Sequence, residues 1–502
     1  MRWGQRGNPS SHWTIGLSHQ WFYLGLVGLT LLHCFFALIL PPIPSELVAW
    51  AYSQNLLTDD SFVSPLLALV IRCSTAIFGH TLFGLRLPAI LLSTLSILAL
   101  STITARHYIL GLALITPIFF IGAVVMSAES LLVFFWSLYV VWLIGANRIL
   151  NEWHGDPVTR VYRRSPVPKF SWVIGGILLA LGTVSHPIMA LALPCTLAVL
   201  VPKYRLKGWI QGFAILLTTA TTLAALFIFF KGQPLWLIHQ PFWSALTLAK
   251  QNTSAIGSFL FSEWLLVGAL PFVLFPIALI KAPDLCHEPR MQVSFAFFVL
   301  PLLCFLGLSW RHQVQGHWAL VAYLSFLPLA QWMIDYTSFR GLVRWTVILS
   351  FLVPFAVSLL FWVHFRFPLK AISPDSDKLS HWKAQYQLAK KMKQTWEEKT
   401  PHVPLVTTDK EWHAYFNFLG VKANWISEQA LTLASGTQNT ISSPAGSQAF
   451  SLCETPELLL WHESKTVPQA TSCFSQAEFW GEFPLTVRDQ EWSRLSLVKY
   501  RK

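Results

Sequence analysis

The sequence predicts an all-α polytopic membrane protein of about 11 spans, followed by a small α/β domain outside the membrane. Hydrophobic residues make up 54% of the 502 residues, charged residues make up only 12%, and the mean hydropathy is +0.50. Soluble domains carry charge on roughly a quarter of their residues. A soluble core cannot bury so much apolar surface, whereas a bilayer requires it. These values exclude an ordinary soluble globular protein.

Apolar segments long enough to cross a bilayer recur up to residue 363, at about 20 residues for each crossing. The run 170–201 is interrupted only by Ser185-His186-Pro187, which leaves open whether it holds one crossing or two. The candidate spans are 21–40, 85–105, 109–125, 131–149, 170–184, 187–201, 209–230, 260–280, 293–309, 318–334 and 345–363.

Basic residues between these segments predict the orientation, because cytoplasmic loops are rich in Lys and Arg. Starting from Arg2 and Arg6 in the cytoplasm, we expect an odd number of crossings, an outer C-terminal tail and no cleavable signal peptide. The formal charge of +12 lies mainly in these loops, so no nucleic acid partner is expected. The predicted cytoplasmic loops hold Arg106, Arg148, Arg160, Arg163, Arg164, Lys169, Lys203, Arg205, Lys207, Lys281, Arg290, Arg340 and Arg344.

The predicted domain division places a membrane domain at 1–368 and a C-terminal domain at 369–502. Within the first, residues 40–84 form an amphipathic loop that we expect to lie along the outer membrane face. The second mixes two kinds of pattern. We expect helices at 380–398 and 411–419, a strand at 403–408 and a Ser/Thr/Gly-rich loop at 435–447.

Two cysteines, Cys453 and Cys473, lie in the C-terminal tail. In an oxidising compartment they would be able to form a disulfide. Two free thiols are an equally good interpretation, so the sequence leaves their pairing open.

Two carboxylates near the outer ends of predicted spans are candidate catalytic bases. Glu46 follows the first span, and Glu129 lies in the turn VVMSAESLLVFFW. Ionisable groups at a membrane boundary are costly and need a reason. The alternative for Glu46 is a solvated interfacial carboxylate, and for Glu129 a place in a helix N-terminus capped by Ser127. Together they would suit proton abstraction from an acceptor hydroxyl or amine.

Cationic side chains on the same side are candidates for binding a phosphate whose lipid tail stays in the bilayer. For any single one the alternative is a snorkelling interfacial side chain. His317 and Trp318 are either an anchor at the membrane surface or part of a sugar or phosphate subsite. The cationic candidates are Arg72, Arg86, Lys250, Arg311, His312 and His317.

Nucleotide-binding motifs are absent from the sequence, which contains neither a P-loop nor a GxGxxG after a predicted strand. A nucleotide sugar is therefore not the expected donor. Histidine, cysteine and acidic residues show no strong metal-binding spacing, so no metal site is assigned. A divalent metal requirement stays open.

Several blocks of sequence resemble the bacterial lipid-linked-sugar glycosyltransferases of the dolichyl-phosphate-mannose–protein mannosyltransferase type, which include lipid A aminoarabinose transferases. These blocks are PPIPSELVAWAYSQNLL, SPLLALVIRCSTAIFG with FGLRLPAILLS, AESLLVFFW and VQGHWALVAYLSFLP. The resemblance implies a GT-C fold in the bacterial inner membrane, with outer-face juxtamembrane helices and a periplasmic C-terminal domain. It also implies inverting transfer of a sugar from a polyprenyl-phosphate donor to an envelope lipid, glycan or protein.

The chain departs from this family's pattern at its acidic motifs. Ser45-Glu46 stands where the family usually has Asp-Glu, and Ser127-Ala128-Glu129 stands where it has Thr-Pro-Asp. The family's Asp-His-Pro-Pro is Phe62-Val63-Ser64-Pro65 here, and a Lys after the fifth span is His186. A serine cannot act as a general base without help, so proton removal would fall to Glu46 or Glu129. The alternative is a catalytically silent relative that binds or moves lipid-linked sugars.

Overall fold

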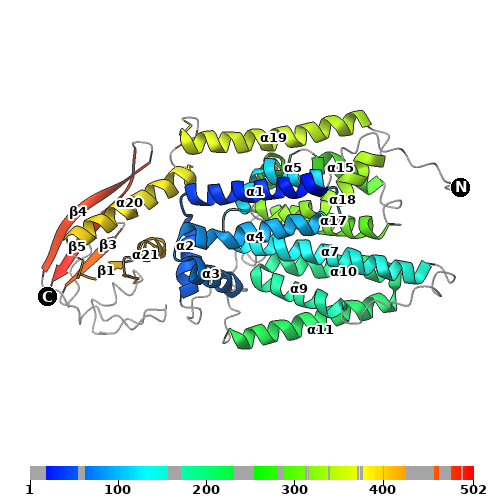
Figure 1. The fold of residues 1–502 in the computed structure, drawn as a ribbon, viewed down its shortest axis with the longest axis horizontal. Helices are drawn as coiled ribbons and strands as arrows, with labels where there is room; N and C mark the ends of the chain where they lie inside the picture. Colours follow the sequence, from blue (N-terminus) through cyan, green and yellow to red (C-terminus); the bar gives the residue numbers. More distant parts are fainter. Residues whose placement is uncertain are drawn as a thin grey trace.

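The computed structural model shows a helical bundle with a smaller domain at one end (Figure 1). Predictions about Lys250, Arg311, His312, the loop 435–447 and the pairing of Cys453 with Cys473 fall outside the residues that it describes. The described residues are 19–54, 63–155, 171–230, 254–268, 270–280, 288–310, 314, 316–336, 340–369, 372–373, 377–399, 401–425, 457–462, 476–487 and 490–501.

The bundle consists of apolar helices, which confirms the predicted all-α membrane domain. Within the described ranges, six helices are long and apolar enough to cross a membrane, and four shorter helices are also apolar. The helices are α1 (His19–Ile39), α2 (Pro44–Gln54), α3 (Pro65–Phe78), α4 (Leu82–Leu100), α5 (Arg106–Ile115), α6 (Pro117–Gly122), α7 (Ala128–Gly155), α9 (Ser171–Ser185), η1 (Pro187–Leu191), α10 (Ala192–Tyr204), α11 (Leu206–Phe229), α14 (Ser254–Val267), α15 (Leu270–Ile280), α17 (Pro289–Ser309), η2 (Gly316–Ala319), α18 (Leu320–Tyr336) and α19 (Arg340–Arg366).

Two of the predicted spans are each interrupted by a break between two α-helices. The segment 109–125 breaks at Pro117, which has no backbone N–H to continue the ladder of α5. The segment 260–280 breaks at Gly268, whose φ is +84°. A Cβ at Gly268 would lie 2.7 Å from the Cα of Ser350 in α19, so only glycine allows this close approach of two backbones. Hydropathy alone detects neither break.

The predicted juxtamembrane loop contains two helices, α2 and α3, between α1 and α4. Ser64 caps α3 by accepting a hydrogen bond from the Leu67 N–H at 3.4 Å, with Pro65 as the first helical residue. Figure 1 shows both helices at the end of the bundle that faces the C-terminal domain.

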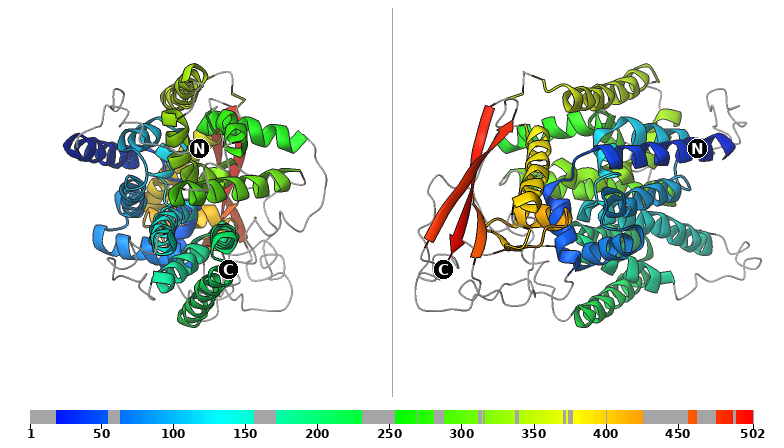
Figure 2. Two further views of the ribbon diagram at one scale, coloured as in Figure 1. Left: turned by 90° about the vertical axis from the view of Figure 1, so that its right-hand side faces the viewer. Right: turned by 60° about the vertical axis from the view of Figure 1, so that its left-hand side comes forward.

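The C-terminal domain has the predicted α/β character. Its five-stranded sheet has the order β2-β1-β3-β5-β4, in which β1 pairs parallel with β2 and β3, while β5 pairs antiparallel with β3 and β4. Figures 1 and 2 show its two helices between the sheet and the bundle. The elements are α20 (Lys378–Lys399), β1 (Leu405–Thr407), α21 (Lys410–Phe418), β2 (Ala423–Trp425), β3 (Glu457–His462), β4 (Gln476–Val487) and β5 (Gln490–Arg501).

Helix α21 holds the C-terminal domain against the juxtamembrane helix α2. The buried Trp50 ring of α2 packs edge-on against Phe418 at 5.1 Å, and its Nε1–H donates to His80 Nδ1 at 3.2 Å. The Tyr415 hydroxyl donates to the Pro42 carbonyl at 3.5 Å. The two parts of the chain therefore share one buried interface next to α2.

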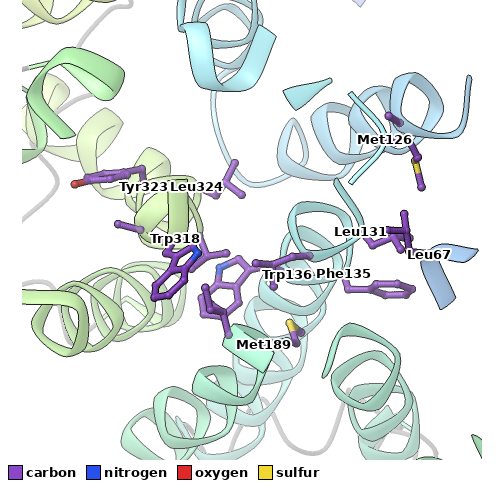
Figure 3. Packing of buried hydrophobic residues seen from close by; sticks show 14 of the residues in the cluster. Leu67, Met126, Leu131, Phe135, Trp136, Met189, Trp318, Tyr323 and Leu324 are labelled. Atoms are coloured by element: carbon purple, nitrogen blue, oxygen red, sulfur yellow. The ribbon is translucent and has the colours of Figure 1, made fainter. Parts of the chain in front are cut away.

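The core of the bundle lies along α7. Trp136 is fully buried, and its Nε1–H donates to Ser325 Oγ of α18 at 2.8 Å. Figure 3 shows the Trp318 ring beside Trp136 in the same cluster. Trp318 is 5% exposed, so it belongs to this core. That position differs from the membrane-surface anchor that the sequence suggested as one alternative.

Candidate active site

Glu129 lies in the first turn of α7, where the helix dipole favours a negative charge. The turn before it is fixed by Ser130, whose hydroxyl donates to the carbonyls of Val125 at 2.9 Å and Gly122 at 3.3 Å. These bonds link the end of α6 to the start of α7. The Glu129 carboxylate is therefore carried on a fixed backbone.

His317 of η2 is the direct partner of Glu129. Its Nε2 lies 3.4 Å from Glu129 Oε1, and the two side chains are 39% and 35% exposed. The sequence predicted both residues for the outer-face site but did not pair them. Because each side chain keeps an open side, the pair can meet a ligand without unfolding of the surrounding helices.

His186 approaches the same pair from the break between α9 and η1. Its backbone is extended, with φ −156°, because Pro187 ends the helix. Its Nδ1 accepts a hydrogen bond from the Ile188 N–H at 3.2 Å, so a neutral imidazole carries its proton on Nε2. The side chain is 4% exposed and interacts electrostatically with Glu129 and His317.

A small cavity of about 50 Å³ opens beside Glu129. Apart from Glu129 and two serines its walls are apolar, and the two lining residues from α4 are small. Such a surface suits a hydrocarbon chain with a polar group at one end. The lining residues are Ala89, Ser93, Phe119, Gly122, Ala123, Glu129, Ser130, Val133 and Leu320.

This arrangement brings two imidazoles from distant parts of the chain to Glu129, a carboxylate that lines an apolar cavity. A carboxylate within hydrogen-bond reach of a substrate can remove a proton, and an adjacent histidine can stabilise or accept that proton. Among the described residues, no group of three histidine, cysteine or acidic side chains is arranged to hold a metal ion.

Arg86 of α4 is fully buried and uses all five of its N–H groups within the protein. Its Nε donates to Glu46 Oε1 at 3.0 Å, and its Nη2 donates to Glu46 Oε2 at 2.6 Å. The remaining N–H groups reach backbone carbonyls at the end of α1: Ala37 at 3.0 Å, Leu40 at 2.8 Å and Pro41 at 2.8 Å. No donor of Arg86 is left for a phosphate in this conformation.

Glu46 is enclosed in the same way. Besides the bonds from Arg86, its Oε2 accepts the Ile43 N–H at 3.0 Å and its Oε1 accepts the Met126 N–H at 2.9 Å. A general base must reach its substrate, but the Glu46 side chain has no exposed surface. The geometry supports a structural role for Glu46 and Arg86 in place of the predicted base and phosphate ligand.

The pair still matters for the site, because Met126 lies three residues before Glu129. The bond from its N–H to Glu46 fixes the chain just before α7. The ion pair therefore joins the end of α1, α2, α4 and the turn that carries Glu129.

The other predicted site residues lie elsewhere. Ser45 is exposed in the first turn of α2, and Arg72 is exposed on α3. Neither lines the cavity beside Glu129. Lys250 and Arg311 fall outside the described residues, so their proposed contact with a phosphate keeps the status of a prediction.

One notable residue was not predicted. Glu263 is an acidic residue in the apolar helix α14, and its side chain is fully buried. The available signal was the glutamate in the apolar run GSFLFSEWLLVG. An ionisable residue inside such a run is costly and deserves a functional explanation.

Comparison with solved structures identifies the fold. ArnT from Cupriavidus metallidurans in the apo state aligns with a TM-score of 0.57 and 13% identity, over 95% of this chain and 98% of that chain. ArnT bound to undecaprenyl phosphate aligns with a TM-score of 0.55 and 12% identity, over 96% of this chain and 98% of that chain. No protein-family model and no curated protein sequence matches this chain. The structural likeness extends over the bundle and the C-terminal domain, and this chain therefore has the GT-C fold of the glycosyltransferase ArnT.

Proposed function

We propose that the protein is an inverting glycosyltransferase that moves a sugar from a polyprenyl-phosphate donor to an envelope lipid, glycan or protein. The observation that carries this proposal is the Glu129–His317 pair, which stands at an apolar cavity within a GT-C fold. The fold supports the general kind of reaction, and the likeness to ArnT bound to undecaprenyl phosphate supports a lipid-linked donor.

In the proposed reaction Glu129 removes the proton from an acceptor hydroxyl or amine. The acceptor oxygen or nitrogen attacks the anomeric carbon of the donor sugar and forms the new bond with inversion. The bond from that carbon to the phosphate oxygen breaks, and its electron pair leaves with the polyprenyl phosphate. His317, 3.4 Å from Glu129, stabilises the carboxylate before the transfer and the proton after it.

The leaving phosphate needs positive charge or hydrogen-bond donors. Arg86 is excluded from this role by its five internal bonds. Lys250, Arg311 and Arg72 remain the cationic candidates, with His317 at the edge of the site. The apolar cavity between α4 and α6 would hold the first part of the polyprenyl chain.

The proposed location is the inner membrane of a bacterium, with Glu129, the cavity and the C-terminal domain on the periplasmic side. The apolar helices support a multi-pass membrane protein. The inner membrane, a cytoplasmic N-terminus and a periplasmic domain at 369–502 follow from the resemblance and from the loop charges, and they belong to this proposal.

The proposal can be tested in cells that lack the protein and are complemented with wild type or variants. Mass spectrometry of envelope lipids and glycans should show a sugar modification that wild type restores. Glu129→Gln should reduce it by about 10²- to 10⁴-fold, the range for loss of a general base. Glu288→Gln is a matched control, because Glu288 is half exposed at a different helix end.

Two results would count against the enzyme. If cells with Glu129→Gln show the same sugar modification as cells with wild type, Glu129 is not the general base. Undecaprenyl phosphate binding by wild type, with no sugar transferred to any envelope component, would favour the catalytically silent relative.

A further inference from the structure

Glu263 is the most unusual buried group in the described part of the bundle. Its side chain is fully buried on α14, and neither carboxylate oxygen has a hydrogen-bond partner there. Burying a carboxylate without a partner costs several kcal/mol even when it takes up a proton. A buried carboxylate of this kind is therefore a costly group in this conformation, and Tyr323 is the polar side chain beside it.

Tyr323 of α18 lies beside Glu263 and shares its condition. Its hydroxyl is close enough to interact with the carboxylate, yet it also lacks a partner that meets hydrogen-bond geometry. The residue is 2% exposed. Figure 3 shows its hydroxyl directed away from the Trp136 cluster. Two polar side chains thus meet in an apolar surrounding.

The location of the pair connects it to the proposed site. Helix α14 contacts η2, which carries His317, and α6, which lines the cavity beside Glu129. Tyr323 lies one helical turn after Leu320, another lining residue of that cavity. The helix that carries Glu263 therefore contacts both the element that holds His317 and a helix that lines the cavity, and Tyr323 lies on the helix that contributes Leu320 to it.

The chemistry of the pair selects a ligand. A carboxylate accepts hydrogen bonds at two oxygens, and a tyrosine hydroxyl can accept one and donate one. Among the described residues, Tyr323 is the ionisable neighbour that Glu263 meets, and no lysine or arginine shares the position. The oxygen atoms of the pair can therefore accept hydrogen bonds from a ligand that carries O–H or N–H groups.

We propose that Glu263 and Tyr323 form a sugar subsite and accept hydroxyl or amino hydrogens of the transferred sugar. This inference rests on the proposed function. Because both groups are closed to solvent in this conformation, the proposal requires the helices around them to move before the sugar reaches them.

The test compares bare and sugar-bearing lipids on the full-length protein in nanodiscs. The probes are undecaprenyl phosphate, polyprenyl-phosphate mannose and a polyprenyl-phosphate amino sugar, with Kd measured by native mass spectrometry. The variants are Glu263→Leu, Glu263→Gln and Tyr323→Phe. Ser262→Ala is the control on the same helix, because the Ser262 hydroxyl bonds within α14 to the Phe259 carbonyl.

We expect Glu263→Leu to raise Tm by several degrees, because it removes an unpartnered buried polar group. The same variant should keep the Kd for undecaprenyl phosphate within about twofold. It should raise the Kd for a sugar-bearing lipid by about 10- to 100-fold, which is the effect of losing one hydrogen bond to a charged group. If the Kd rises for both sugar-bearing lipids, the contact is with sugar hydroxyls. If the Kd rises only for the amino-sugar lipid, the contact is with the amine.

Three outcomes would overturn the subsite. One is an unchanged Kd for both sugar-bearing lipids in Glu263→Leu and Tyr323→Phe. Another is a wild-type protein that binds the sugar-bearing lipids no tighter than undecaprenyl phosphate. The third is equal loss for all three lipids. A wild-type protein that binds none of them contradicts the proposed function itself. If Glu263→Leu does not fold, Glu263→Gln and Tyr323→Phe decide between the same outcomes.

Discussion

Arg86 Nη2 lies 2.6 Å from Glu46 Oε2, and neither side chain has any exposed surface. The two residues are 40 positions apart in the sequence, and their bonds join α1, α2, α4 and the turn before α7. Removing one partner of such a pair leaves an uncompensated buried charge, which is far more costly than the pair itself. The relationship is therefore a stability element that supports the site.

Arg86→Met should destabilise the protein by about 3–5 kcal/mol, because the buried Glu46 carboxylate would lose its only ion-pair partner among the described residues. The loss should appear as a lower midpoint in thermal or denaturant unfolding of the protein in detergent. Arg72→Met is the matched control. Arg72 is exposed on α3, so this change should stay within about 0.5 kcal/mol. Equal stability of the two variants would contradict the structural role of Arg86.

His317→Ala should lower the rate of sugar transfer by about 10- to 100-fold, the value of one hydrogen bond to a charged group. The reason is the loss of the partner that lies 3.4 Å from Glu129. Binding of undecaprenyl phosphate should change little, because the lost group acts on the carboxylate. If the affinity for undecaprenyl phosphate falls by the same factor as the transfer rate, His317 binds the phosphate and does not act through Glu129.

Gly122→Val should block the cavity beside Glu129. A Cβ at Gly122 would meet no heavy atom within 4 Å, so the new side chain fills space without a clash. We expect weaker binding of undecaprenyl phosphate and slower transfer, with little change in Tm. Gly145→Val is the control, because Gly145 on α7 is also helical, is equally free of neighbours and lies outside the cavity. Similar lipid binding by the two variants would remove the cavity from the proposed donor site.

The C-terminal domain should lose stability as the pH falls from about 6.5 toward 4. Burial lowers the pKa of His413 from 6.5 to about 4. The unfolded chain takes up the proton first, so the stability from this group is complete above pH 6.5 and is lost as the pH falls through the folded pKa. The loss reaches about 3 kcal/mol for this group.

Urea unfolding of the full chain, followed by proteolysis of the C-terminal domain at several pH values, would measure this dependence. His413→Gln should flatten the curve between pH 6.5 and 4. His402→Gln should leave its shape unchanged, because His402 is exposed. An unchanged slope in His413→Gln would show that other groups cause the loss.

Much of the fold could be predicted from the sequence, because apolar length and loop charge act locally. The helices α1, α7, α11 and α20 lie close to their predicted ranges. The breaks in the predicted spans 109–125 and 260–280 were missed. Each depends on one residue, Pro117 or Gly268, and the second depends on contact with the distant α19. The long hairpin of β4 and β5 was also missed.

The candidate site was predicted in part. Glu129 and His317 were selected as polar residues beside apolar segments, and His186 was named only through the family resemblance; the structure brings the three together. Glu46 and Arg86 were selected by the same rule and prove to be paired with each other. Sequence distance hides such a pairing, because whether a carboxylate faces a substrate or a guanidinium depends on tertiary packing. Glu263 shows the opposite error, since it was taken for an ordinary part of a span.

The packing of α21 against α2 has a consequence for the biogenesis of the protein. Trp50 is synthesised early, whereas Phe418, which packs against its ring, is synthesised much later. The helices from α3 to α19 are therefore synthesised before the Trp50 ring can make this contact. Until α21 is made, the face of Trp50 that Phe418 covers has no contact with it. A chain whose synthesis stops between residues 50 and 418 therefore lacks the contact between Trp50 and Phe418.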